Sequence, residues 1–249
     1  MFNKRHIVRT IAATVSILAL SFTAACGSGQ STASNSTDSD DITQQTYKPG
    51  KLTIATGQPA YEPWVMNDKP ESGEGYEAAV AYAVADKLGF KKSDVVWTRT
   101  AFDTAIAPGA KDWDFNIQQF GITDERKKAV DFSSSYYNDS QSVVVKKDSK
   151  FANATKVSDL KDATVGVMVG TLAYDYAKAN IKDDIQTFND DAALAQALDA
   201  GQIDVLVTST VECVYMVQSE QVKDAKVLGR LPDSEDKSGM GIVLSLIHI

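Results

Sequence analysis

Short β-branched runs alternate with helical segments along this chain, and that alternation restricts the fold class more than any other feature of the sequence. The run at residues 52–56 (LTIAT) is followed by a turn-rich stretch from Gly57 to Gly75 and then by a helical pattern. In that pattern Val80, Val84 and Leu88 recur at four-residue spacing, and Gly89 is a stop signal. Strand, loop and helix in this order predict an α/β fold.

A second series of strands and helices begins after residues 131–133 (DFS). It predicts strands at residues 143–145, 164–169 and 203–207, and a helix that opens at Gly170 and Thr171. A further amphipathic helix, which ends at Gly201, carries Ala192, Leu194, Ala195 and Leu198 on one face. We therefore expect two α/β lobes with a ligand cleft between them, at the carboxyl ends of the strands.

Charge and histidine content exclude several classes of function. The net charge is −8, and three of the basic residues lie within the first nine positions, so the rest of the chain is more acidic still. So acidic a surface argues against nucleic acid as a partner. The two histidines are His6 and His248, so residues 7–247 hold no triad or metal site built on histidine. We expect no metal, no cofactor and no catalysis.

The N-terminus has the layout of an export signal. Residues 1–9 are basic, residues 11–20 are mostly apolar, and three small residues precede Cys26. The apolar run is about half of the ~20 residues that a membrane-spanning helix needs, which disfavours the alternative of a permanent anchor. With Cys26 directly after the small residues, the segment resembles a bacterial lipoprotein signal, which implies a lipidated Cys26 held at the outer face of the cell membrane. Thr23 stands where that family most often has leucine.

Residues 27–46 are rich in Ser, Thr, Gly, Asp and Gln, a composition that buries too little apolar surface to fold and predicts a flexible tether. At the other end, residues 244–249 (LSLIHI) resemble translated sequencing adaptor, with a genuine short strand as the alternative. The domain boundaries that we predict are a signal at residues 1–25, a lipidated linker at 26–46, lobe 1 at 47–137, lobe 2 at 138–235, and a truncated return to lobe 1 at 236–249.

Several segments in a fixed order together resemble the solute-binding proteins of polar amino-acid ABC transporters. They are AYEPW at residues 60–64, GYE at 75–77, ITDER at 122–126, VDFS at 130–133, VGV at 165–167, GT at 170–171 and GQID at 201–204. The resemblance covers about residues 52–243. It implies a two-lobed fold of the type II periplasmic-binding-protein class. It also implies a monomer that captures an amino acid and delivers it to a membrane permease.

The resemblance assigns the ligand carboxylate to Arg126, whose planar guanidinium can bind a carboxylate at two points. Without the resemblance, Arg126 reads as a surface residue in a charged run. We expect the other contacts to come from small or hydroxyl residues, aromatic residues and amides: Gly121, Thr123, Gly170, Thr171, Tyr61, Trp64, Phe102, Gln58 and Gln119. Each has a structural alternative: an N-cap for Thr123, a routine turn at Gly170 and Thr171, core packing for the aromatic residues, and solvated loops for the glutamines.

One departure from the family pattern concerns the ligand ammonium. The family usually has an acid shortly after the strand at residues 203–207, and this chain has Ser209 there. If the segment after Ser209 is helical, Glu212 shares its face and could reach back to the cleft. The alternative is a solvent-facing Glu212. Cys213, in an apolar stretch, is expected to be a buried small hydrophobic residue.

Two other functions stay open at this point. The same scaffold can support an enzyme, such as a dehydratase working through carboxylates, because fold alone does not fix function. A sensor module of a larger receptor is the third possibility, and it would require additional domains.

Overall fold

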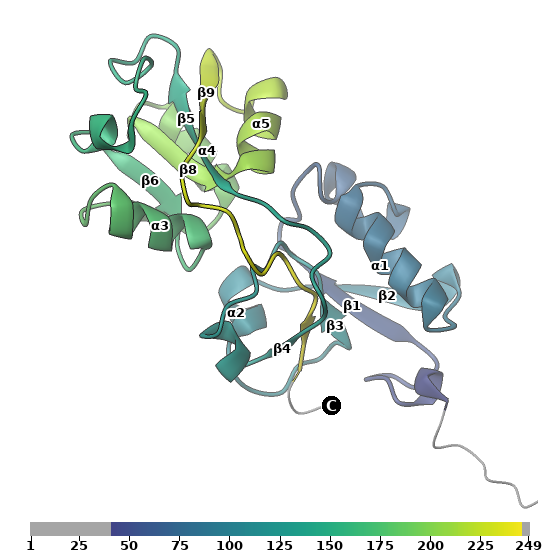
Figure 1. Cartoon of the computed structure of the whole chain (residues 1–249). Helices are drawn as coiled ribbons and strands as arrows, with labels where there is room; N and C mark the ends of the chain where they lie inside the picture. The colour runs from purple at the N-terminus through teal and green to yellow at the C-terminus, as the bar shows by residue number, and fades with distance from the viewer. Residues whose placement is uncertain (1–40, 246–249) are drawn as a thin grey trace, which may run out of the picture. The chain divides into compact units, whose positions relative to one another are not determined.

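The computed structural model describes residues 41–245, which form two five-stranded mixed sheets (Figure 1). The first sheet has the order β2-β1-β3-β10-β4. Its strands are β1 (Leu52–Thr56), β2 (Val95–Arg99), β3 (Phe115–Asn116), β4 (Asp131–Phe132) and β10 (Val243–Leu244). β1 runs parallel to β2 and β3, whereas β10 lies between β3 and β4 and is antiparallel to both.

The second sheet has the order β7-β6-β8-β5-β9 and comes from one continuous part of the chain. Its strands are β5 (Gln141–Lys146), β6 (Val165–Met168), β7 (Gln186–Phe188), β8 (Val205–Ser209) and β9 (Ala225–Arg230). β6 is parallel to β7 and β8, and β5 is antiparallel to β8 and β9. The strands predicted at residues 52–56, 143–145, 164–169 and 203–207 are all present, with ends that differ by up to two residues.

Five α-helices cover the sheets: α1 (Tyr76–Lys87), α2 (Phe102–Ile106), α3 (Leu172–Asn180), α4 (Asp191–Asp199) and α5 (Thr210–Gln218). Six short 3-10 helices lie in the connections: η1 (Ile42–Gln44), η2 (Met66–Asp68), η3 (Pro70–Ser72), η4 (Lys92–Asp94), η5 (Arg126–Lys128) and η6 (Val157–Leu160). The helix of α5 provides the geometry that the hypothesis about Glu212 requires.

Helix α1 packs against the first sheet with a wider face than its sequence pattern predicts. The predicted stripe of Val80, Val84 and Leu88 is only half-buried, whereas Ala81 and Ala85 are fully enclosed against the first sheet. Alanine has no side chain beyond Cβ, so this face lets the helix approach the sheet closely while the larger residues pack at its edge. Glu77 lies one turn before Ala81 on this alanine face and is also buried.

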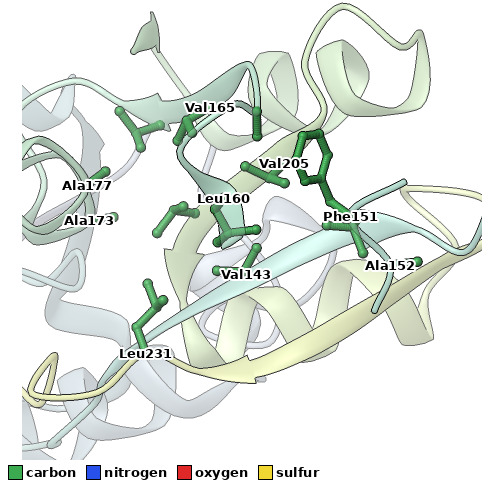
Figure 2. Close-up of a cluster of buried hydrophobic side chains, with 13 residues drawn as sticks. Val143, Phe151, Ala152, Leu160, Val165, Ala173, Ala177, Val205 and Leu231 are labelled. Carbon is green, nitrogen blue, oxygen red and sulfur yellow. The ribbon is translucent and has the colours of Figure 1, made fainter. Parts of the chain in front are cut away.

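The second sheet is packed on both faces. On one face α3 contributes Ala173 and Ala177 to a cluster with Val165 and Val205 of the strands (Figure 2). On the opposite face α4 and α5 contribute a second cluster that includes the buried, free Cys213. The prediction that Cys213 is a buried hydrophobic residue is confirmed, and burial raises the pKa of its thiol well above the usual value.

The signal, Cys26 and residues 246–249 lie outside the described residues, so the hypotheses about them stay predictions. The last part of the predicted tether does have structure. Asp41 caps the 3-10 helix η1 through its Oδ1, and the carbonyl oxygen of Thr43 accepts from the backbone N–H of Gly50 at 2.8 Å. Within residues 41–245, we find no helix that is both long and apolar enough to span a membrane.

Candidate ligand-binding site

A cavity lies among residues from both sheets and from the segments that connect them. Its empty volume is about 740 Å³, including solvent at the mouth, which is in the range of small-molecule sites. Of the twelve residues predicted to contact ligand, eight line it: Tyr61, Phe102, Gln119, Gly121, Arg126, Thr171, Ser209 and Glu212. The loops that follow the strands bring these residues together from positions up to 151 residues apart in sequence.

Arg126 turns inward from the charged run that surrounds it. Its neighbours Lys127 and Lys128 form exposed ion pairs with acids three residues earlier. The guanidinium of Arg126 instead donates to the carbonyl oxygens of Gly121 at 2.7 Å and Gly170 at 2.8 Å. Burial lowers the pKa of Arg126, but the group stays cationic because its ordinary pKa is so high.

The guanidinium keeps donor capacity beyond these two bonds. It has five N–H groups, and two carbonyl oxygens occupy two of them. Phe102 lies against it, with Cζ 5.4 Å from the ring centroid, a cation–π distance that fixes the plane of the fork. Within the described part of the chain, Arg126 forms no ion pair with an acid closer than 4 Å. An oriented cation without a paired anion is suited to a ligand carboxylate.

Gly121 allows the two sides of the cavity to meet. A Cβ at this position would lie 2.6 Å from Cδ1 of Leu172, on α3, and 2.8 Å from Oδ2 of Asp236. A larger residue would require the ends of both side chains to shift from their observed positions. The predicted role of Gly121 therefore has a packing component that the sequence did not indicate.

Thr171 is the N-cap of α3. Its hydroxyl accepts from the backbone N–H of Tyr174 at 3.2 Å and donates to the carbonyl of Met168 at 2.8 Å. Thr171 lines the cavity, but Gly170 does not, and the carbonyl of Gly170 is the group bound by Arg126. Gly170 therefore does not contact the cavity as predicted, but its carbonyl oxygen helps to position Arg126, which does.

Three other predicted contacts do not line the cavity. Trp64 is 1% exposed and packs edge-on against Tyr76 and Tyr137, so it belongs to the core. Thr123 accepts from the backbone N–H of Arg126 at 3.1 Å, which matches the alternative of a capping role. Gln58 is exposed, and the next residue, Pro59, contributes to the cavity wall in its place.

Tyr61 links the first βα loop to α4. Its hydroxyl accepts from the backbone N–H of Ala192 at 3.4 Å, and burial raises the pKa of the phenol. Ala192 is in the first turn of α4, where a free N–H needs an acceptor. Tyr61 therefore both lines the cavity and joins its two sides.

Gln119 owes its position to a residue that the sequence analysis did not select. Its φ of +53° is unusual for a residue other than glycine. Glu77 accepts from the backbone N–H of Gln119 at 2.8 Å and also from its side-chain amide. The hydroxyl of Tyr136 donates to the same carboxylate. Burial raises the pKa of Glu77 to about 7, against the lowering effect of these hydrogen bonds.

Glu212 is buried at the cavity wall, not exposed to solvent. It is 6% exposed and accepts from the Thr208 hydroxyl at 2.9 Å. Ser209 is the N-cap of α5, and its hydroxyl accepts from the backbone N–H of Glu212 at 3.2 Å. The structure thus places Glu212 where the hypothesis needs it, while its role toward an ammonium stays a prediction.

Three further acids that the sequence analysis missed also line the cavity: Asp139, Asp191 and Asp236. Burial raises the pKa of all three, in the case of Asp191 to about 6. Asp191 starts α4 directly after its N-cap Asp190, so the sequence signal for it was only a helix start. Asp139 and Asp236 lie in the segments that enter and leave the second sheet, where no local pattern marks a site. No group of acids, cysteines or histidines among residues 41–245 has the arrangement of a metal site.

Comparison with known proteins identifies the family. The sequence profile of the bacterial extracellular solute-binding proteins, family 3, matches residues 52–168. The glutamine-binding protein of Geobacillus stearothermophilus is 31% identical over 225 residues, which cover 82% of each chain. The chain belongs to this family. A family 3 solute-binding protein of this kind is extracytoplasmic by the family's description.

Two further similarities extend the comparison. The L-cystine-binding protein TcyJ of Escherichia coli K12 is 31% identical over 160 residues, and the match spans 64% of this chain but only 59% of the relative's length. Among solved structures, the ancestral amino-acid-binding protein AncCDT-1, a precursor of cyclohexadienyl dehydratase, aligns with a TM-score of 0.66 and 29% identity. It covers 79% of this chain and 82% of its own. The predicted two-lobed α/β fold is confirmed for this family 3 protein.

Proposed function

We propose that this protein is the substrate-binding component of an ABC importer, which captures an amino acid outside the membrane and delivers it to a permease. The observation that carries the proposal is the guanidinium of Arg126, held against Phe102 in a cavity between the two sheets. Family membership supports it, because the relatives compared above are named as amino-acid-binding proteins.

The carboxylate of the ligand binds Arg126 through the free N–H groups of the fork. Thr171 lies in the same cavity at the N-terminus of the nine-residue helix α3, whose dipole also favours an anion. Acids also line this cavity and provide acceptors for an ammonium. The cavity therefore offers both a cation and acids, the two kinds of group that a zwitterion needs.

A thermal-shift screen of the purified chain against the common amino acids tests this function. A ligand at 100 times its Kd raises the free energy of unfolding by ~2.7 kcal/mol, and we expect at least one amino acid to do so. D-enantiomers of the same amino acids are the matched control, because a shaped cavity distinguishes them. A screen in which no amino acid raises the unfolding temperature contradicts the proposal.

We further propose that Cys26 is lipidated and holds the protein at the outer face of the membrane, as the order of residues in the N-terminal segment suggests. One acyl chain gives marginal membrane binding, so stable anchorage requires two or more. Mass spectrometry of the native N-terminal peptide should show cleavage before Cys26 and lipid on its sulfur. An unmodified Cys26 in membrane-extracted protein overturns this part of the proposal.

A carboxylate-dependent dehydratase is the second candidate, and the similarity to AncCDT-1, a precursor of such an enzyme, is the observation that favours it. The two functions differ in what happens to the ligand. A binding protein returns the ligand unchanged, whereas a dehydratase releases water from it. Mass analysis of the amino acid recovered after long incubation with the protein therefore separates them, and we expect an unchanged mass.

A further inference from the structure

The cavity has an excess of negative groups. Four carboxyl side chains line it, those of Asp139, Asp191, Glu212 and Asp236, while Arg126 is its one cationic residue among the described lining residues. A monocarboxylate ligand occupies Arg126 and brings one ammonium. One ammonium leaves most of these carboxyl groups without a positive partner, and such groups are costly to bury unpaired.

Two of the acids form a pair that has too few hydrogen-bond donors. Asp191 and Glu212 are each 6% exposed, and both lie near the hydroxyl of Thr208, at 3.3 Å and 2.9 Å. A hydroxyl has a single hydrogen, so it can satisfy only one of the two carboxylates at a time. Neither acid forms an ion pair with a lysine or arginine of residues 41–245 within 4 Å. The pair therefore lacks a donor that carries positive charge.

The rest of the wall offers further acceptors. Gln118 is 9% exposed, and its buried Oε1 has no hydrogen-bond partner in the structure. The amide nitrogen of Gln119 is occupied by Glu77, which leaves its Oε1 as the free end of that side chain. Both residues line the same cavity as the acid pair. Unpaired acceptors of this kind call for a ligand rich in N–H groups.

One of the other two acids, Asp236, lies beside Arg126, because its Oδ2 is 2.8 Å from the position of a Cβ on Gly121, whose carbonyl oxygen Arg126 binds. The charge of the guanidinium influences Asp236, and Asp139 influences both Asp236 and Glu212. Asp139 and Asp236 each have a buried Oδ2 without a hydrogen-bond partner. An α-amino acid carries its ammonium one carbon from its carboxylate, so an ammonium of a ligand anchored on Arg126 falls on this side. The pair Asp191 and Glu212 is then left for the ligand's side chain.

We propose that the ligand is an amino acid with a second positive charge in its side chain, and that Asp191 and Glu212 bind that charge. This inference rests on the proposed function and narrows its substrate class. It also assigns Glu212 to the side-chain end of the ligand, where the sequence alone suggested the α-ammonium. The competing structural explanation is that the two acids simply share a proton across Thr208 and never contact ligand.

Matched ligand pairs test the charge directly. L-arginine and L-citrulline have nearly the same shape but differ in charge, and L-lysine and L-norleucine differ in the terminal ammonium. Calorimetry on the full chain should show at least ~100-fold tighter binding of the charged member of at least one pair. Glu212→Gln and Asp191→Asn should each lower the affinity for the charged ligand by ~10-fold or more. Their affinity for the neutral ligand should stay within ~3-fold of that of the unmodified protein. Asp183→Asn, an exposed acid in the same sheet unit, is the control.

Each other outcome has a definite meaning. Equal losses for L-arginine and L-citrulline in Glu212→Gln would assign Glu212 to the α-ammonium and overturn the inference. Equal affinity for both members of each pair in the unmodified protein would overturn it too, while the proposed function would stand. Failure of every amino acid to bind would instead contradict the proposed function itself.

Discussion

The carboxylate of Glu77 holds Gln119 at two points, through the backbone N–H and through the side-chain amide. Glu77 is fully buried in α1 and does not line the cavity, whereas Gln119 does. The acid therefore determines which end of the Gln119 amide faces the ligand. Because its pKa is raised to about 7, this arrangement is sensitive to protons near neutral pH.

Glu77→Gln should weaken L-arginine binding by about 1–2 kcal/mol at pH 8, because an amide in place of the carboxylate sets two N–H donors against each other. Calorimetry measures the loss, and the exposed Glu74→Gln is the control. A raised pKa in the folded state means that the free energy of unfolding decreases as pH rises from about 4.5 to 7. That decrease should be smaller in Glu77→Gln. An unchanged slope together with unchanged affinity would show that Glu77 has no positioning role.

Arg126→Ala should weaken the binding of every amino acid ligand by about 2–5 kcal/mol, because it removes the charge-assisted hydrogen bonds from the guanidinium to the ligand carboxylate. Arg126→Lys should recover only part of this loss, since an ammonium cannot bind both carboxylate oxygens in one plane. Lys127→Ala, next to it and exposed, should change the affinity by less than ~1 kcal/mol. Calorimetry with one ligand across the three variants gives the comparison. Near-native affinity of Arg126→Ala would return this residue to a structural role.

Ser209→Asp should not tighten the binding of L-citrulline. Aspartate can keep the N-cap of α5, so the helix start is preserved. The new carboxylate would stand in a wall that already contains Asp139 and Glu212, and the repulsion offsets its attraction for the ammonium. If Ser209→Asp tightens binding while Glu212→Gln binds normally, the other acids do not compensate for the missing one.

Binding of L-arginine at pH 7 should release protons. Asp191 has a pKa raised to about 6 and faces Asp190, while Glu212, with its pKa raised further above the usual value, faces Asp191 and Asp139. A cation favours the charged carboxylates, lowers both pKa values and drives protons off. For the same reason, affinity should fall as pH decreases through about 6. Calorimetry in buffers of different ionisation enthalpy measures the release, which should be absent with L-citrulline.

Gly121→Ala should weaken L-arginine binding by about 1–3 kcal/mol, because its Cβ would overlap Leu172 and Asp236. Leu172→Ala removes the side chain that makes the closer of these two contacts. The double variant should therefore recover affinity relative to Gly121→Ala alone, and an equilibrium titration of all three proteins measures the coupling. Additive losses would mean that this contact does not limit how closely the two sides meet.

The sequence was sufficient to predict structural features that repeat along the chain and site residues that stand near strand ends. The α/β fold followed from alternating periodicity, and Arg126 and Thr171 followed from family motifs next to predicted strands. It was insufficient for Glu77, because a buried acid in a helix has the same local pattern as an exposed one. It was also insufficient for Asp139 and Asp236, which reach the cavity only because distant strands bring their segments together.

In two places the sequence pattern did not account for the effect of residue size on packing. Trp64 was expected at the ligand because it stands beside Tyr61 in the motif, but its large ring gains more from full burial against Tyr76 and Tyr137. In α1, the valine spacing identified residues that pack at the edge of the core, but it missed Ala81 and Ala85, whose small side chains let the helix approach the sheet closely. Both cases were decided by tertiary packing, which periodicity does not report.

The position of β10 between β3 and β4 determines the order in which the chain can complete its folding. Every strand of the second sheet lies within residues 141–230, so that sheet can form from one uninterrupted segment. In the first sheet, β4 pairs only with β10, which arrives more than 100 residues later. If the chain is threaded through a membrane from its N-terminus, the half that emerges first is the last to close. Until then, the edge of β3 is exposed on the outside of the cell, where it can pair with other chains.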